Sequence, residues 1–302
     1  MRASAPPDGD GDAPVTVHAR SRGAAGGDRR AGGDRPGERV RARSGRFPWL
    51  LVIPALGGLV FLALPMAGLL LRAPWSTLGT RLLEPEIRAA LALSLTTATV
   101  ATGVALVLGV PLAWLLARTA FPGRRFVRAL VTVPMVMPPV VGGVALLLAL
   151  GRRGVVGQFL YDGFGYSMPF TTPAVVVAQV FVAMPFLVIS VEGALRGADR
   201  RYEEAAATLG ATRATIFRRV TLPMVLPGVL AGAVLCWARA LGEFGATITF
   251  AGNFPGRTQT MPIAVYLEMQ RDPETAIVVS LVLLLVSIAI LVGLRDRWVR
   301  AL

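Results

Sequence analysis

Two opposite charges, Arg239 and Glu243, lie four residues apart within an otherwise apolar segment of this chain. On a helix this spacing places both side chains on one face, where they can neutralise each other. If the segment crosses a membrane, a lone charge at its centre would cost about 2.5–3.5 kcal/mol, so the pair must face protein or water. Two interpretations stay open: an ion pair that only holds helices together, or an arginine that lends positive potential to a passing anion.

Residue types that support enzymatic chemistry are scarce. The chain has 31 basic residues and no lysine, so it lacks a GxxxxGK[ST] phosphate loop and cannot itself be a nucleotide hydrolase. Its one histidine, His18, lies in a polar N-terminal stretch, which disfavours Ser-His catalysis and histidine metal sites. Cys236 is expected to be a small packing residue, and Tyr161-Asp162 lacks the second aspartate motif of an intramembrane protease. We therefore expect no catalytic residue, metal site or cofactor in this chain.

The elements that position the charged pair are long apolar runs. Hydrophobic residues make up 54% of the chain, and the mean hydropathy is +0.61. Continuous runs favour helices over the alternating segments of a membrane barrel. The sequence predicts an all-α polytopic membrane protein with six transmembrane helices, because six runs can cross about 30 Å of hydrocarbon: 49–71, 91–117, 129–150, 172–191, 225–250 and 276–294.

Arginine is distributed unevenly between the runs. Ten arginines precede the first run, four lie in 118–128, six lie in 192–224 and three follow residue 294, whereas the other three connections hold three, two and two. Positive residues collect on the cytoplasmic side of a membrane. Both termini and the 192–224 loop are therefore predicted to be cytoplasmic. The net charge of +13 then follows from topology and needs no nucleic-acid partner.

Residues 1–46 differ in composition from the rest of the chain. They are rich in Gly, Asp, Arg and Ala and contain no apolar run, so we predict a disordered cytoplasmic tail. Residues 47–302 then form the transmembrane domain. Arg41, Arg43 and Arg46 are expected to rest against anionic lipid headgroups. The first apolar run is long enough to stay as an anchor, so no cleavable signal peptide is expected.

The cytoplasmic loop at about 192–224 carries a distinctive set of residues at fixed spacing: Glu204, Ala205, Ala206, Leu209, Gly210, Leu222 and Pro223. This set resembles the EAA loop of ABC-importer permeases, the element that receives the push of a separate ATPase. The family has isoleucine where this chain has Val220. The pattern predicts a short helix over 204–209, a turn at Gly210, and a second helical piece with an apolar stripe at Ile216, Phe217 and Val220.

Prolines and glycines have distinct roles in two of the apolar runs. The third run contains a candidate kink or hinge formed by Pro134, Pro138, Pro139, Gly142 and Gly143. Proline removes a backbone donor, and the freed carbonyls are tolerated only where protein or water covers them. Either a static kink or a hinge fits. In the fifth run, Gly228 and Gly232 form a small-xxx-small pair that predicts close helix packing.

The fifth run and the residues after it carry a more specific resemblance. Residues 239–247 read Arg-Ala-Leu-Gly-Glu-Phe-Gly-Ala-Thr, and they are followed by Gly252-Asn253, Pro255-Gly256, Thr258 and Thr260-Met261-Pro262. This stretch closely resembles molybdate permeases. Sulfate permeases are similar through the Arg-Ala-Leu-Gly-Glu core and usually differ after the asparagine. The likeness runs from about residue 49 to the end of the chain, and it does not separate molybdate from the nearly isosteric tungstate.

The resemblance implies a type I ABC importer in a bacterial cytoplasmic membrane. Two copies of the chain would form the pathway, two ABC ATPase subunits would bind ATP inside, and a periplasmic or lipid-anchored molybdate-binding protein would deliver the anion outside. Arg239 and Glu243 become candidate residues of the anion pathway near the dimer centre. A permease for sulfate, thiosulfate or tungstate is the alternative. A membrane scaffold that transports nothing is a distant one, because it leaves the EAA loop and the kinked third run unexplained.

Overall fold

The computed structural model describes residues 49–299. The predicted tail of residues 1–46, with His18 and its arginines, lies outside the described residues. The chain divides into one unit, Met1–Ile53, and a second unit, Pro54–Leu302. The arrangement described below is that of the second unit.

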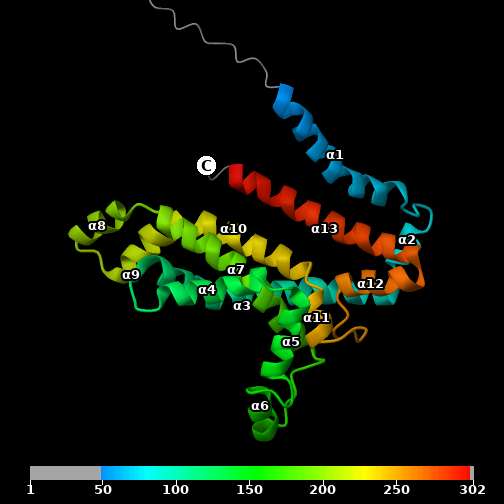
Figure 1. The fold of residues 1–302 in the computed structure, drawn as a ribbon. Helices are drawn as coiled ribbons and strands as arrows, with labels where there is room; N and C mark the ends of the chain where they lie inside the picture. The colour runs from blue at the N-terminus through cyan, green and yellow to red at the C-terminus, as the bar shows by residue number, and fades with distance from the viewer. Residues whose placement is uncertain (1–48, 300–302) are drawn as a thin grey trace, which may run out of the picture. The chain divides into compact units, whose positions relative to one another are not determined.

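All regular structure in residues 49–299 is helical, which confirms the predicted all-α class. The α-helices are α1 (Trp49–Leu71), α2 (Leu78–Leu82), α3 (Pro85–Arg118), α4 (Arg124–Val136), α5 (Pro139–Leu150), α6 (Gly157–Phe164), α7 (Thr172–Gly197), α8 (Arg200–Thr208), α9 (Arg213–Ile216), α10 (Leu222–Leu241), α11 (Gly245–Phe250), α12 (Met261–Arg271) and α13 (Pro273–Val299), with one π-helical turn, η1 (Phe217–Thr221), between α9 and α10 (Figure 1).

Five helices in the described residues are long and apolar enough to span a membrane, and the pair α4–α5 makes a sixth span if it is counted as one. The runs predicted at 49–71, 91–117, 172–191 and 276–294 fall on α1, α3, α7 and α13. The third run is not one straight helix, because α4 and α5 are bent by 118°. The fifth run is also divided, because α10 ends at Leu241 and α11 starts at Gly245.

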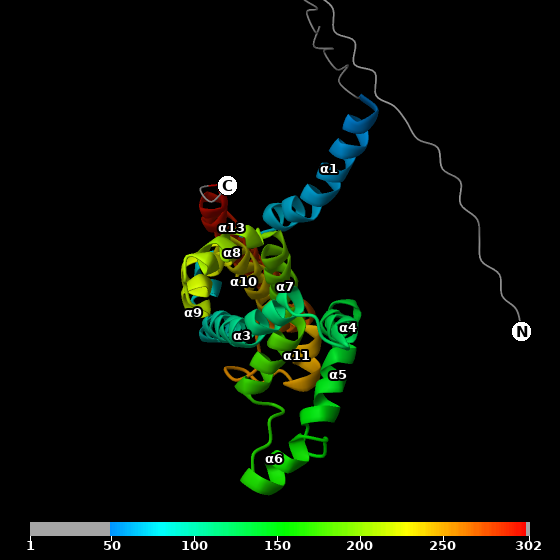
Figure 2. The same cartoon turned by 90° about the vertical axis from the view of Figure 1, so that its left-hand side faces the viewer.

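Helices α3, α7 and α10 pack together as the centre of the fold, and α5 leads away from them to α6 (Figures 1 and 2). The contact surface of α3 consists largely of alanine: Ala98, Ala101 and Ala105 are fully buried against α7 residues such as Leu187. Lipid tails are as apolar as leucine, so helices in a membrane associate through close van der Waals packing of small residues. The alanine face of α3 provides this packing.

The predicted close approach at Gly228 and Gly232 is confirmed. A Cβ atom built on Gly228 would overlap the Cβ of Ala194 on α7, and one built on Gly232 would lie 2.9 Å from the Cβ of Ser190. The Ser190 hydroxyl also donates a hydrogen bond of 3.0 Å to the Gly228 carbonyl. The absence of side chains at Gly228 and Gly232 therefore allows α7 and α10 to pack in close contact.

Substituting alanine at Gly228 is expected to destabilise the fold by about 1–3 kcal/mol, because over-packing forces the two helices apart. Gly193→Ala on α7 is the matched control, since a Cβ there meets nothing within 4 Å. The unfolding midpoints of the two variants in detergent measure the difference. Equal midpoints would show that the α7–α10 contact relaxes without cost.

Candidate functional site

The first part of the predicted coupling loop is a short helix, α8. The Asp199 side chain caps its start by accepting a hydrogen bond from the Arg201 N–H at 2.9 Å, which satisfies one of the free donors at a helix N-terminus. Glu204 and Ala205 are exposed and Ala206 is half-buried. Helix α8 buries none of its residues, so its outer side is free to meet another protein.

The end of α8 differs from the prediction by one residue. Leu209 is the C-cap and not part of the helix, and its side chain is 88% exposed. Gly210 has φ +80°, as the predicted turn requires. The Gly210 N–H donates to the Ala207 carbonyl and the Ala211 N–H donates to the Ala206 carbonyl, the two bonds of a Schellman motif. The turn thus holds an apolar side chain outward at the tip of the loop.

The second helical piece of the loop continues directly into a membrane span. Thr212 caps α9 by accepting from the Thr215 N–H at 3.3 Å, and η1 joins α9 to α10 without a break. Leu222 and Pro223, the last two residues of the predicted coupling-loop set, therefore lie in the first turn of α10. In a helix, a proline ring clashes with the carbonyl four residues earlier. For Pro223 that carbonyl belongs to Arg219, which lies within the wider π-turn at Phe217–Thr221.

Sequence reasoning missed the residue that attaches α8 to the rest of the protein, Glu203. Its carboxylate oxygen Oε1 accepts from Arg118 Nη2 at 2.9 Å and from the Thr221 hydroxyl at 2.9 Å. Arg118 is the last residue of α3, and Thr221 is the last residue of η1. Three separate helical segments, α3, α8 and η1, therefore meet at one carboxylate.

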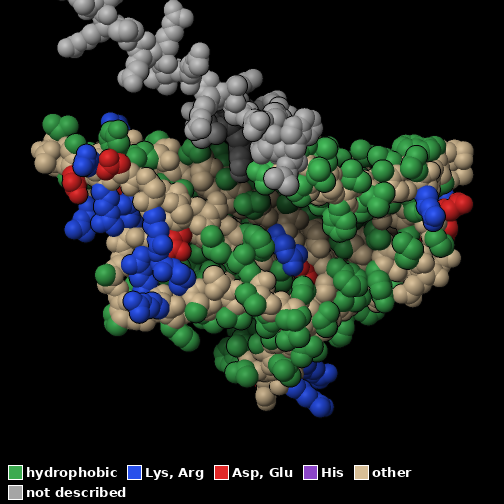
Figure 3. Space-filling view, turned by 45° about the horizontal axis from the view of Figure 1, so that its top comes forward, with side chains coloured by type: hydrophobic (Ala, Val, Ile, Leu, Met, Phe, Trp, Pro, Cys, Tyr) green, Lys and Arg blue, Asp and Glu red, His purple; other side chains and the backbone are tan. Residues whose placement is uncertain are grey.

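A second missed carboxylate, Glu192, ties α7 to the first half of the bent span. Glu192 is buried, and its Oε1 accepts from Arg128 of α4 at 2.6 Å and from Arg196 at 2.7 Å. This end of the unit is strongly basic, with arginine side chains over α8 and α9 in the space-filling view (Figure 3). The surface arginines of the loop include Arg213, Arg218 and Arg219.

At the start of α13, Arg81 of α2 forms an ion pair of 2.9 Å with Glu274 and also donates hydrogen bonds to Asp272 and Thr275. The hydrogen bond from Arg81 lowers the pKa of Asp272 to about 2, so this carboxylate stays charged at neutral pH. The cluster fixes the start of α13 to α2.

Arg239 and Glu243 form the predicted ion pair, with 2.7 Å between Arg239 Nη2 and Glu243 Oε2. They do not share a helix, however. Arg239 lies in the last turn of α10, and Glu243 follows the break at Gly242. The other carboxylate oxygen of Glu243 accepts from the Ala246 N–H at 2.8 Å. Because this bond satisfies a first-turn donor of α11, Glu243 both neutralises Arg239 and starts the next helix.

The two broken spans meet each other. In α5, a Cβ on Gly143 would lie 2.8 Å from the Ala246 carbonyl oxygen of α11. In α11, a Cβ on Gly245 would lie 2.8 Å from the Cβ of Pro139. The predicted kink residues thus lie on both sides of the break. Pro134 lies inside α4, Pro138 is the N-cap of α5 and Pro139 its first residue, and Gly142 and Gly143 are buried. Gly142 faces the Phe181 ring of α7, at 3.1 Å from a built Cβ.

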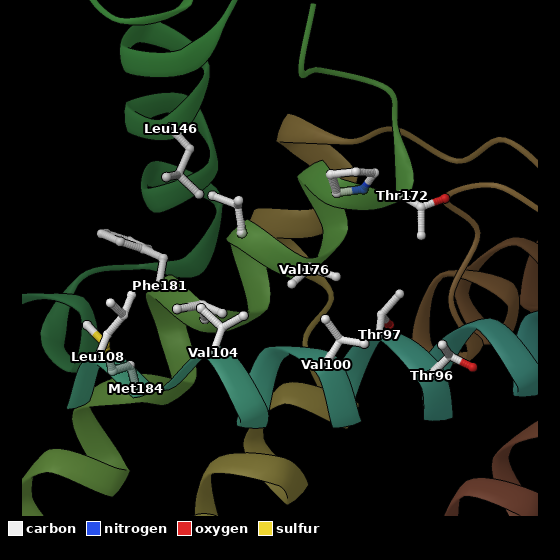
Figure 4. A pocket seen from close by; sticks show the side chains of 13 residues that line it. Thr96, Thr97, Val100, Val104, Leu108, Leu146, Thr172, Val176, Phe181 and Met184 are labelled. Carbon is white, nitrogen blue, oxygen red and sulfur yellow. The ribbon is translucent and has the colours of Figure 1, made fainter. Parts of the chain in front are cut away.

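A cavity of about 780 Å³ lies between α3, α5 and α7 and is lined by apolar side chains and threonines (Figure 4). Val100, Val176, Phe181 and Met184 contribute to its wall. Neither Arg239 nor any other charged residue lines it, so it offers no countercharge to an anion. Across residues 51–290, no three His, Cys, Asp or Glu side chains are grouped closely enough to hold a metal ion.

Comparison with known proteins gives concordant matches. The family model for the binding-protein-dependent transport system inner membrane component matches residues 106–301. The chain is 46% identical over 250 residues to the molybdenum transport system permease protein ModB of Mycobacterium tuberculosis, covering 83% of this chain and 94% of that protein. It is 35% identical over 240 residues to the sulfate transport system permease protein CysT of Salmonella typhimurium, covering 78% and 86% of the two chains.

A solved structure has the same fold. The crystal structure of a bacterial ABC transporter involved in the import of the acidic polysaccharide alginate matches with a TM-score of 0.67. The match covers 83% of this chain and 94% of that chain at 20% identity. At this identity the likeness concerns the fold alone.

Proposed function

Because the chain belongs to the family of binding-protein-dependent transport system inner membrane components, we propose that it is the membrane permease subunit of an ABC importer for molybdate. The observation that carries the substrate is the 46% identity to a molybdenum transport permease over nearly the whole of that protein. The multi-pass helical fold suits a pathway subunit.

The same proposal assigns the other tasks of the importer to separate subunits. ATP binds to separate ABC ATPase subunits, which dock on the loop that presents Leu209 and Glu204. The permease itself binds no cofactor and catalyses no reaction. A solute-binding protein delivers the oxyanion, and a second copy of this chain completes the pathway. Localisation is the bacterial cytoplasmic membrane, with both chain termini and α8 on the cytoplasmic side, as the arginine distribution favours.

Arg239 is the residue that we place on the anion route. Its side chain is 28% exposed in the single chain, whereas its partner Glu243 is 1% exposed. The pair stands at the break between α10 and α11, next to the break between α4 and α5. Irregular backbone at membrane depth is tolerated where it is covered by protein or lines a water-filled cavity. Two adjacent breaks beside a partly exposed arginine therefore support a polar route at this position.

Sulfate is the second candidate substrate, favoured by the 35% identity to the sulfate permease CysT. Tungstate is so close to molybdate in size that the permease residues do not distinguish the two. The identity difference of 46% against 35% supports molybdate as the first choice.

Uptake of radiolabelled molybdate into vesicles that contain the complete importer tests this proposal. We expect ATP-dependent uptake that unlabelled molybdate and tungstate compete away and that a large excess of sulfate leaves nearly unchanged. Equal competition by sulfate would transfer the function to the sulfate alternative. Absence of any oxyanion uptake by an assembled, ATP-hydrolysing complex would contradict the proposal.

A further inference from the structure

We propose that Glu203 is the positioning residue that makes the coupling helix α8 move together with the membrane helices α3 and α10. This inference rests on the proposed function, in which α8 receives the motion of an ATPase. The exposed surface of α8 makes contact with that partner, whereas Glu203 faces the other way and determines whether the contact has a mechanical effect.

Helix α8 has little else to hold it to the membrane domain. It buries none of its residues, and hydrophobic burial is the usual source of attachment between helices. Its backbone packs mainly beside α9 and η1, its neighbours along the chain. The bonds from Glu203 to Arg118 and to Thr221, both 2.9 Å long, are the polar links from α8 to the last residue of α3 and to the residue before α10.

The setting makes these bonds stronger than an ordinary surface ion pair. The Arg118 side chain is 9% exposed and that of Glu203 is 25% exposed, so water screens the pair less than it screens surface charges. Within residues 51–290, Arg118 has one carboxylate at ion-pair distance, and it is that of Glu203. Thr221 is 4% exposed. A displacement of α8 therefore pulls on two buried groups at once.

Both groups belong to helices of the central bundle. Helices α3 and α10 pack against each other and against α7, and α10 carries Arg239 in its last turn. One carboxylate thus connects the exposed loop to the helix that ends at the ion pair. A short helix can transmit a rigid-body displacement only if it is fixed to the elements that it moves, and Glu203 supplies that fixation.

The adjacent residue provides a matched control. Glu204 has the same side chain on the same helix, but it is exposed and makes no hydrogen bond or ion pair within the described part of the chain. Glu203→Gln and Glu204→Gln remove one negative charge each at neighbouring positions. In the isolated chain, a general charge effect changes the mobility of the loop equally in both variants, whereas a positioning effect changes it only in Glu203→Gln.

The first measurement uses the purified full-length chain and needs no anion. A spin label at Leu209→Cys, in a Cys236→Ala background, reports the mobility of the loop tip. We expect Glu203→Gln and Arg118→Gln to increase label mobility several-fold, Thr221→Val to increase it less, and Glu204→Gln to leave it unchanged. The Glu203→Gln/Arg118→Gln double variant should be no more mobile than either single variant, because the two residues act as one unit.

The second measurement is the amount of molybdate taken up per ATP hydrolysed by the reconstituted importer. We expect a several-fold loss for Glu203→Gln, with hydrolysis and ATPase binding retained. A wild-type-like label mobility in Glu203→Gln, an equal rise of label mobility in Glu204→Gln, or unchanged uptake per ATP in Glu203→Gln would overturn the proposal. A wild-type complex without molybdate uptake would instead contradict the proposed function, and the mobility measurement would still decide whether Glu203 holds α8.

Discussion

Replacing Gly210 with proline is expected to abolish ATP-driven uptake while the chain still inserts and assembles. Gly210 has φ +80°, and a proline ring fixes φ near −65°, so the turn cannot form. Proline also lacks the N–H that donates to the Ala207 carbonyl at 3.0 Å. Strain of about 1–3 kcal/mol and the lost hydrogen bond together displace Leu209 from its outward position. We expect uptake to fall at least about ten-fold, equivalent to about 1.4 kcal/mol.

The control for this variant is Gly165→Pro. Gly165 has φ +65°, and it ends α6 with an N–H that donates to the Tyr161 carbonyl at 2.8 Å. Its backbone demands are the same, but it lies outside the coupling loop. Vesicle uptake, normalised to the amount of assembled complex, compares the two variants. Normal uptake by Gly210→Pro would show that the turn is not needed for coupling.

The second large effect concerns the ion pair between Arg239 and Glu243. Arg239→Ala alone leaves Glu243, which is 1% exposed, as an unpaired buried charge, and breaking a buried pair in this way costs about 3–5 kcal/mol. We expect this single variant to assemble poorly. Adding Glu243→Gln removes the stranded charge, and the glutamine carbonyl can still accept from the Ala246 N–H that starts α11. The double variant should therefore assemble.

Transport by this double variant distinguishes the two roles of Arg239. If the arginine attracts the anion, uptake stays low in the assembled double variant, because the positive potential along the route is gone. Uptake of labelled molybdate per assembled complex is the measurement, and we expect it to remain at least about ten-fold below wild type. Full recovery of uptake would reduce Arg239 to a structural partner of Glu243.

Features that depend on local sequence were predictable. The apolar runs gave the fold class because a membrane span has a fixed minimum length. The turn at Gly210 and the close packing at Gly228 followed from what a missing side chain permits. The end of α8 was wrong by one residue, at Leu209, because helix ends depend on cap geometry more than on composition.

Features that depend on tertiary contacts were not predictable. The length of the largely apolar run 225–250 concealed the break after α10, where the Ala246 N–H donates to the Glu243 carboxylate at the start of α11. Glu203 and Arg118 are 85 residues apart, and among many arginines nothing in the sequence indicates which one is its partner. The prolines of the third run did predict an interruption, but its 118° angle depends on how α5 packs against α11.

The contact between α5 and α11 has an evolutionary consequence. Because a Cβ at Gly143 would meet the Ala246 backbone and a Cβ at Gly245 would meet Pro139, enlarging either glycine alone pushes the two helices apart. The atoms in the way include the Ala246 carbonyl oxygen and the Val140 nitrogen, which no substitution removes. Relatives with the same double break should therefore keep glycine at both positions.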